Sequence, residues 1–376
     1  MTMNVSAPEP ALARPAADAW FLDARPTLLP GVEELPGLDN KPMLYQPISG
    51  KYVALTPAAV KISRMFDGSR TGREILARIG VTPQDDAAPR VARMAAELRQ
   101  LGFLTEPAHA EDTRTRISRF AAREHMWRWE LVRDAGRFLE PLAAPLRRFS
   151  GLSLIAVWSM FTIAGLVTGI YAITHVRVEA MPPHLWLVLP ILVLQIVIHE
   201  FAHAIVCQYL GAPVRSAGFG LMLYVMPVGY VDRTDSHRVT SRSGRVAISL
   251  AGPMSDQIWF GVTGLVALSA GPELRSFAVV LMVLQILLTI MNFNPLTPSD
   301  GYHAATAAFG IVNLRGKSFA LLLHRVIHSP LPPTLERIST RERRIMTGYG
   351  ALCLLFALAL GVAAVRTAIR VIGVLT

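Results

Sequence analysis

The chain has 376 residues, of which 52% are hydrophobic and 17% are charged, whereas soluble proteins carry roughly 25% charged residues. Its 64 charges, 37 Lys and Arg plus 27 Asp and Glu, are unevenly spread, with 39 of them in residues 1–150. This asymmetry excludes a uniform soluble globule and a wholly disordered chain. It predicts a soluble N-terminal part followed by a membrane-embedded part.

The net charge of +10 comes almost entirely from arginine. These arginines crowd the edges of apolar segments, which favours contact with an anionic membrane surface over nucleic-acid binding. Cys207 and Cys353 lie far apart in apolar stretches, so neither a disulfide framework nor a CxxC metal site is expected. Residues 1–30 lack the apolar core of a signal peptide, and the N-terminus is therefore expected to be cytosolic.

Residues 1–40 are rich in Pro, Ala and Asp, and we expect a flexible leader there. The pattern then changes to two strand-like runs, 43–48 and 52–55, followed by three helix signals. The first helix begins at Thr56-Pro57, the second has a Thr71/Glu74 capping box, and the third ends near Gly102. Residues 41–106 are thus predicted to form a small soluble α+β domain.

Residues 107–148 form an arginine-dense linker that contains Trp127, Trp129 and Phe138. Because the linker directly precedes an apolar segment, we expect an amphipathic helix at the membrane interface, in contact with lipid. A solvated linker is the alternative.

A polytopic membrane helix bundle is predicted for the rest of the chain, which makes the fold mainly α. An apolar segment of about 20 residues crosses the hydrocarbon of a bilayer. Five such spans are expected, at residues 152–173, 184–207, 246–270, 277–291 and 346–365. Residues 218–231 are apolar and too short to cross, and we expect a re-entrant hairpin there. Residues 311–376 make up a cytosolic segment and the last span.

Arginine asymmetry predicts the orientation of these spans. The segment before the first span, residues 233–245 and residues 315–344 are basic, so they are expected in the cytosol. The second and fourth spans then both end on the cytosolic side, which brings two polar clusters to a similar depth. The chain is therefore predicted to be a multi-pass protein of the cytoplasmic (inner) membrane, with its active site near the cytosolic face.

The first polar cluster is an HExxH motif, His199-Glu200-Phe201-Ala202-His203. Histidines at i and i+4 share one helix face and can reach the same ion, and neutral imidazole suits Zn²⁺. Glu200 can then take the proton from a zinc-bound water. A structural histidine pair is the alternative, but ionisable residues inside a membrane are usually functional.

A catalytic zinc typically needs a third protein ligand, and the second cluster, residues 292–301, offers Asp300. Pro295 and Pro298 interrupt the helix there, so Asp300 is expected to project from irregular backbone. His303 is a rival ligand, which we rank below Asp300.

These motifs resemble those of site-2-protease-type (M50-type) intramembrane zinc metalloproteases. That family combines HExxH with a later Asn-x-x-Pro-(x)4-Asp-Gly, matched here by Asn292, Pro295, Asp300 and Gly301. The resemblance covers about residues 149–310. It implies one zinc ion bound by His199, His203 and Asp300, Glu200 as the base, and Asn292 as a contact to the substrate backbone. A middle motif, residues 251–256, has Asp256 where the family usually has Asn.

The N-terminal domain resembles the PqqD-like domain, a winged-helix-type fold that binds leader peptides. The resemblance rests on residues 45–56, the Phe66-Asp67-Gly68 turn and the run 91–103. It implies that a leader peptide adds as a strand beside residues 45–55, where Tyr45 and Tyr52 could contact it. An unspecialised regulatory domain and a DNA-binding domain are the alternatives, and acidic residues interleaved with the arginines argue against DNA.

The resulting hypothesis is a membrane-embedded zinc endopeptidase that matures a ribosomally synthesised precursor peptide captured by its cytosolic domain. One alternative is regulated intramembrane proteolysis of a membrane-anchored anti-sigma factor or a signal-peptide remnant. A non-enzymatic alternative is a membrane peptide-binding or immunity protein. The sequence does not predict the oligomeric state.

Overall fold

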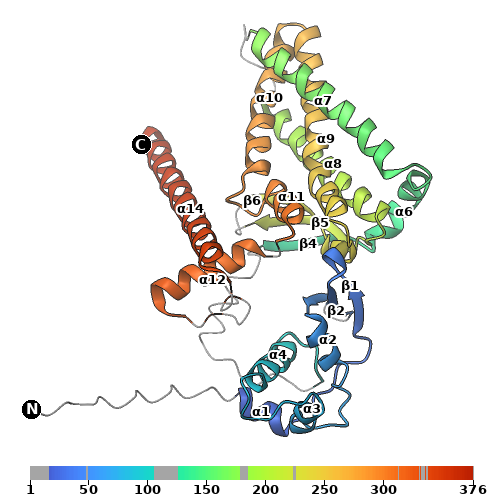
Figure 1. Cartoon of the computed structure of the whole chain (residues 1–376). Helices are drawn as coiled ribbons and strands as arrows, with labels where there is room; N and C mark the ends of the chain where they lie inside the picture. The colour runs from blue at the N-terminus through green and yellow to red at the C-terminus, as the bar shows by residue number, and fades with distance from the viewer. Residues whose placement is uncertain are drawn as a thin grey trace, which may run out of the picture. The chain divides into compact units, whose positions relative to one another are not determined.

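The structure is a computed structural model and describes residues 17–47, 50–105, 126–177, 185–222, 226–311, 313–329, 331, 335 and 338–375. The described chain is mainly helical, with two small antiparallel sheets (Figure 1). It divides into two compact units, residues 1–121 and 122–376. A soluble-type α+β part and a helical part were both predicted.

The first unit contains a three-stranded antiparallel sheet in the order β1-β2-β3. Its hairpin pairs β2 with β3 in a register that sets Tyr45 opposite Tyr52. Thr56 caps the next helix through Ala59 N, and Thr71 with Glu74 forms the predicted capping box. The elements are α1 (Ala17–Asp23), β1 (Glu33–Pro36), a 3₁₀ helix (Leu38–Asn40), β2 (Pro42–Gln46), β3 (Lys51–Ala54), α2 (Pro57–Ser63), α3 (Gly72–Arg78) and α4 (Ala88–Gln100).

The predicted leader is partly wrong, because α1 and β1 belong to this folded unit. Phe21 on α1 is fully buried in the same core as Phe66, Ile75 and Leu98. The first residue of α3 is Gly72, where an added Cβ would lie 2.0 Å from the Phe21 carbonyl oxygen. This stretch shows no long periodic run because it contains only a seven-residue helix and a four-residue strand. Residues 1–16 of the expected leader lie outside the described residues.

The second unit holds the helices that were predicted as membrane spans. Four described helical segments are long and apolar enough to cross a membrane, which indicates a membrane protein. They are Gly151–His175 (α7), Leu185–Tyr209 (a 3₁₀ turn, Leu185–Leu187, followed by α8, Val188–Tyr209), Pro272–Phe293 (α10) and Thr340–Ala363 within α14 (Thr340–Leu375). Each coincides with an expected span, within a few residues.

The remaining expected span is also helical, as α9 (Arg242–Ser269), but it is not among the four most apolar segments. Its place in the fold explains the difference, since α9 packs against α7, α8, α10 and α11 (Asp300–Phe309) (Figure 1). A helix enclosed by other helices can carry buried polar side chains. Glycines bring α9 close to α7, since an added Cβ at Gly261 would lie 2.3 Å from the Gly165 Cα.

A second sheet in the order β4-β5-β6 lies beside these helices (Figure 1). Strands β5 (Ser216–Met222) and β6 (Met226–Val231) form the predicted hairpin. The third strand corrects part of the interfacial-helix prediction, because residues 126–133 form β4 (Met126–Arg133), which pairs with β5. Within the described residues 126–148, only α6 (Ala135–Leu146) is helical. Gly218 permits this pairing, since an added Cβ would lie 2.1 Å from the Trp129 carbonyl oxygen. Residues 107–125 of the linker lie outside the described residues.

Candidate metal centre

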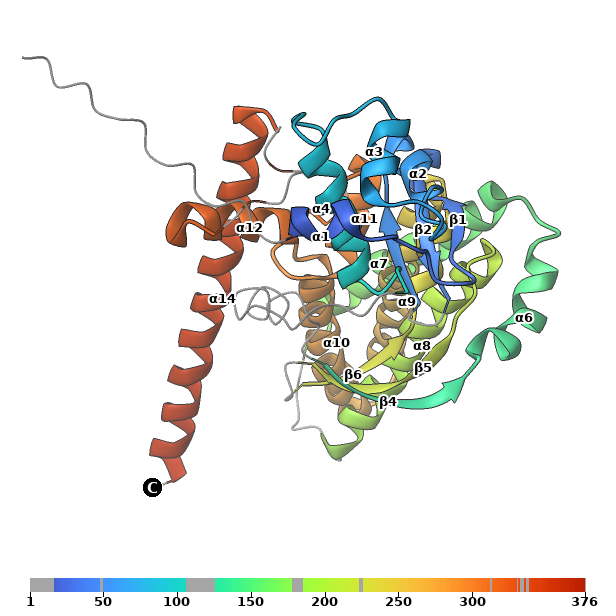
Figure 2. The ribbon, with the colours of Figure 1, turned by 90° about the horizontal axis from the view of Figure 1, so that it is seen from below.

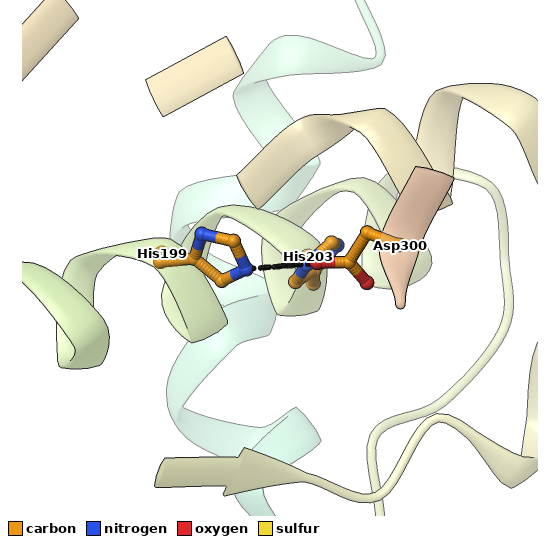
Figure 3. Close-up of side chains that lie close together, drawn as sticks. All are labelled: His199, His203 and Asp300. Carbon is orange, nitrogen blue, oxygen red and sulfur yellow. Dashed lines mark hydrogen bonds and ion pairs between the residues drawn. The ribbon is translucent and has the colours of Figure 1, made fainter. Parts of the chain in front are cut away.

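The two predicted clusters meet in the structure. His199 and His203 lie one turn apart on α8, and Asp300 is the first residue of α11. Asp300 Oδ2 lies 3.0 Å from His199 Nε2 and 3.2 Å from His203 Nε2, and the two Nε2 atoms are 3.1 Å apart (Figure 3). All three residues are buried and could together hold a metal ion. The rival ligand, His303, is not part of this group.

The hydrogen bond that Nδ1 makes determines which nitrogen of each imidazole faces the candidate metal centre. His203 Nδ1 lies 2.6 Å from the Ile248 carbonyl oxygen, which can only accept a hydrogen bond, so Nδ1 carries the proton. His199 Nδ1 lies 2.8 Å from Asp256 Oδ2 and donates to that carboxylate in the same way. When each ring is neutral, its unprotonated Nε2 therefore faces inward. Partners of this kind are typical of metal-binding histidines.

Three electron-pair donors converge on one point as a result. Two bare nitrogens and a carboxylate oxygen repel one another unless a proton or a cation lies between them. In a tetrahedral zinc site with bonds of about 2.0–2.1 Å, neighbouring ligand atoms are separated by about 3.3 Å. The observed separations of 3.0–3.2 Å are close to that spacing. The donor set thus fits a divalent metal with one open coordination position.

The charges of the surrounding residues favour a cation as well. Asp256 and Asp300 are 6% and 8% exposed, and Arg233 NH1 donates a hydrogen bond of 3.3 Å to Asp300 Oδ1. One guanidinium cannot neutralise two buried carboxylates, and a divalent ion would offset the remaining charge.

Gly252 on α9 leaves the space that an ion needs. A Cβ added at this position would lie 2.4 Å from Nε2 of both His199 and His203. Any side chain here would occupy the centre itself. The middle motif therefore needs a glycine at position 252 for steric reasons, which the sequence pattern alone did not reveal.

Asp256 is the residue of the middle motif whose role the sequence left open. Besides His199 Nδ1, its carboxylate accepts a hydrogen bond of 3.2 Å from Gln195 Nε2 and one of 3.3 Å from Asn292 Nδ2. Gln195 Oε1 in turn accepts from Gln285 Nε2 at 2.9 Å. The sequence signal for this network is polar residues at a helical spacing in apolar helices, namely Gln195 and His199 on α8 and Gln285 and Asn292 on α10. The network fixes the orientation of the His199 ring from its Nδ1 side, opposite the metal centre.

Replacing Asp256 should weaken metal binding without unfolding the protein. We expect Asp256→Ala to lower zinc affinity about 10- to 100-fold, as is typical for a lost outer-shell partner of a metal ligand. Asp256→Asn should cost less, because an amide oxygen still accepts from Nδ1. Competition with a chromophoric chelator measures both affinities. Equal affinities for the wild type and Asp256→Ala would contradict the orienting role.

The predicted base, Glu200, follows His199 on α8 and is half-buried. It lies against β6, since a Cβ added at Gly229 would be 3.5 Å from the Glu200 Cγ and 3.1 Å from the Ile196 Cγ2. Arg233, two residues beyond the end of β6, is close enough to feel the charges of both Glu200 and Asp300. A carboxylate and a guanidinium thus border the metal ligands on the side of the sheet.

Three other residues that were predicted to contact the substrate have partners within the protein. Asn292, expected to touch the substrate backbone, directs its amide to Asp256. Tyr45 is buried and stacks on the half-buried Tyr52, with ring centroids 4.6 Å apart, so the two rings support each other across the hairpin. Substrate contacts by Asn292, Tyr45 and Tyr52 stay predictions.

Comparisons with protein-family models, with curated proteins and with solved structures gave no match. The proposed class therefore rests on the motifs and on the geometry of the metal centre.

Proposed function

We propose that this chain is a membrane-embedded zinc endopeptidase of the site-2-protease type. The observation that carries the proposal is the convergence of His199, His203 and Asp300 on one point, with Glu200 adjacent on α8. The three side chains come from helices that are far apart in sequence and were singled out by two independent motifs. A structural histidine pair would not require a buried carboxylate at ligand distance from both rings.

The chemistry follows from the positions of these groups. When bound, zinc would supply a Lewis acid that polarises the scissile carbonyl and lowers the pKa of water. Glu200 accepts the proton of the attacking water and passes it to the leaving amine. Arg233 places a second positive charge at the rim, where negative charge develops on the carbonyl oxygen. Asp256 and the Ile248 carbonyl keep both imidazoles in the correct tautomer.

Strand β6 offers a way to present the scissile bond. It is the end strand of its sheet among the described residues, and it lies against the α8 face that carries Glu200. A helical substrate hides its peptide groups, so the cleaved segment must be extended. An extended segment paired with β6 would satisfy its backbone hydrogen bonds beside the metal ligands.

The N-terminal unit is the proposed leader-binding module. Its central strand, β2, is already covered by β1, so the expected leader cannot pair with β2. Strand β3 is at one end of the described sheet and is the edge that we assign to a leader peptide. The basic flanks of the spans support a cytosolic position for this unit, and separately for the metal centre, at the inner membrane.

Cleavage of a cognate precursor by the purified, detergent-solubilised protein tests the proposal. We expect one defined cut that a zinc chelator abolishes and that stoichiometric zinc restores. Removing the leader from the precursor should slow the cut strongly, which distinguishes peptide maturation from regulated intramembrane proteolysis. Binding of the precursor without any cleavage in the presence of zinc would instead support the non-enzymatic alternative.

A further inference from the structure

The C-terminal helices α12 (Leu314–Ile327) and α14 pack on each other (Figures 1 and 2). The start of α12 lies near α11, since the Arg315 N–H donates to the Tyr302 hydroxyl. The crossing of α12 and α14 is close, because a Cβ added at Gly350 would lie 2.9 Å from the Ser318 carbonyl oxygen. Leu321 and Cys353 are buried at this crossing, whereas most apolar side chains of α14 beyond it are exposed. Apart from this crossing, α14 is little covered by the rest of the chain.

The loop between α10 and α11, residues 294–299, presents Asp300 to the metal centre. Pro295 and Pro298 have no backbone N–H, so this loop cannot be fixed by a regular ladder of hydrogen bonds. Asn294 accepts two hydrogen bonds from within the loop: its side-chain oxygen accepts from Leu296 N–H, and its carbonyl accepts from the Ser299 hydroxyl. A ligand at the end of such a loop needs support from neighbouring elements to keep its position.

The C-terminal helices provide that support through three hydrogen bonds. Tyr349 on α14 donates its hydroxyl to the Pro295 carbonyl at 2.6 Å. Arg315 on α12 donates from NH1 to the Leu296 carbonyl at 2.8 Å, and its backbone N–H donates to the Tyr302 hydroxyl at 3.0 Å. Two bonds thus hold the loop before Asp300, and the third holds the first turn of the helix that Asp300 begins.

We propose that Tyr349 and Arg315 are positioning residues, which hold the Asp300 loop at ligand distance from the two histidines. The inference rests on the proposed metal function. The C-terminal helix pair thereby has a role. The hydroxyl of Tyr349 connects α14, which other helices largely leave uncovered, to the loop that carries Asp300. A change in the position of α14 would therefore reach Asp300 directly.

The test compares Tyr349→Phe, Arg315→Gln and the double variant in the full-length protein. Each single change removes one side-chain hydrogen bond to the loop, and one such bond corresponds to about 3- to 10-fold in the zinc dissociation constant. We expect the double variant to bind zinc at least 10-fold more weakly than the wild type. Tyr171→Phe and Arg325→Gln are matched controls, because both side chains are exposed. Tyr171 is on α7, and Arg325 is at the opposite end of α12 from Arg315. The zinc affinity of both control variants should equal that of the wild type.

Saturating zinc provides a readout that a merely structural role would not move. If the residues position a ligand, excess zinc restores most of the precursor cleavage by the double variant. Wild-type zinc affinity in the double variant would overturn the inference, and so would lowered cleavage that excess zinc fails to rescue. Absence of zinc binding by the wild type would instead defeat the proposed function, so the two failures are distinguishable.

Discussion

Gly252→Ala is expected to abolish metal binding and, with it, all peptide cleavage. The added methyl carbon would lie 2.4 Å from both inward-facing histidine nitrogens, closer than any non-bonded contact allows. It would occupy the volume in which the ion must sit. Because α9 is held by four other helices, it cannot shift away without disturbing the core. Zinc content per chain after dialysis should fall from one to near zero.

Gly361→Ala is the matched control, since it is the same substitution in the apolar helix α14. A Cβ added at Gly361 meets no described atom within 4 Å. This variant should keep wild-type zinc content, and the methyl group should stabilise the helix slightly. Normal zinc content in Gly252→Ala would show that the ion, if present, lies elsewhere.

Glu200→Gln should have the opposite profile, with zinc retained and cleavage lost. The side chain is not one of the three converging ligands, so affinity for zinc should change little. A glutamine cannot accept the proton of the attacking water, and general-base catalysis typically contributes 10²- to 10⁴-fold. We therefore expect kcat to fall by at least about 100-fold while precursor binding persists. Single-turnover cleavage assays with zinc-loaded protein measure the loss.

Glu273→Gln serves as the control for this change, because Glu273 is exposed in the first turn of α10. It should cleave at the wild-type rate. A fully active Glu200→Gln variant would remove Glu200 from the mechanism. A variant that loses its zinc would reassign Glu200 from base to ligand.

The sequence predicted the convergence of His199, His203 and Asp300 better than it predicted the surroundings of this group. HExxH fixes two ligands on one helix face, and the proline-interrupted cluster points to Asp300, so local spacing carries this information. The orienting role of Asp256 and the steric need for Gly252 depend on how α9 crosses α8. No local pattern encodes that crossing.

The differences in the fold have the same origin. Apolar length predicted the four most hydrophobic helices well, because membrane spans are set by composition over about 20 residues. Strand β4 was predicted as a helix because the arginine-dense linker directly precedes an apolar span, although the alternation Trp127-Arg128-Trp129 is a strand pattern, and pairing with β5 makes it a strand. Helix α1 is only seven residues long, too short for a periodic signal, yet its Phe21 fills the core of the first unit.

X-ray absorption spectroscopy at the zinc edge of the purified protein would show whether His199, His203 and Asp300 bind the ion. We expect one zinc per chain with two imidazole nitrogens at about 2.0–2.1 Å and carboxylate oxygen at about 2.0–2.2 Å. Asp300→Ala should remove one oxygen from this shell and leave both imidazoles. A spectrum without histidine ligands, or one that Asp300→Ala leaves unchanged, would contradict this set of ligands.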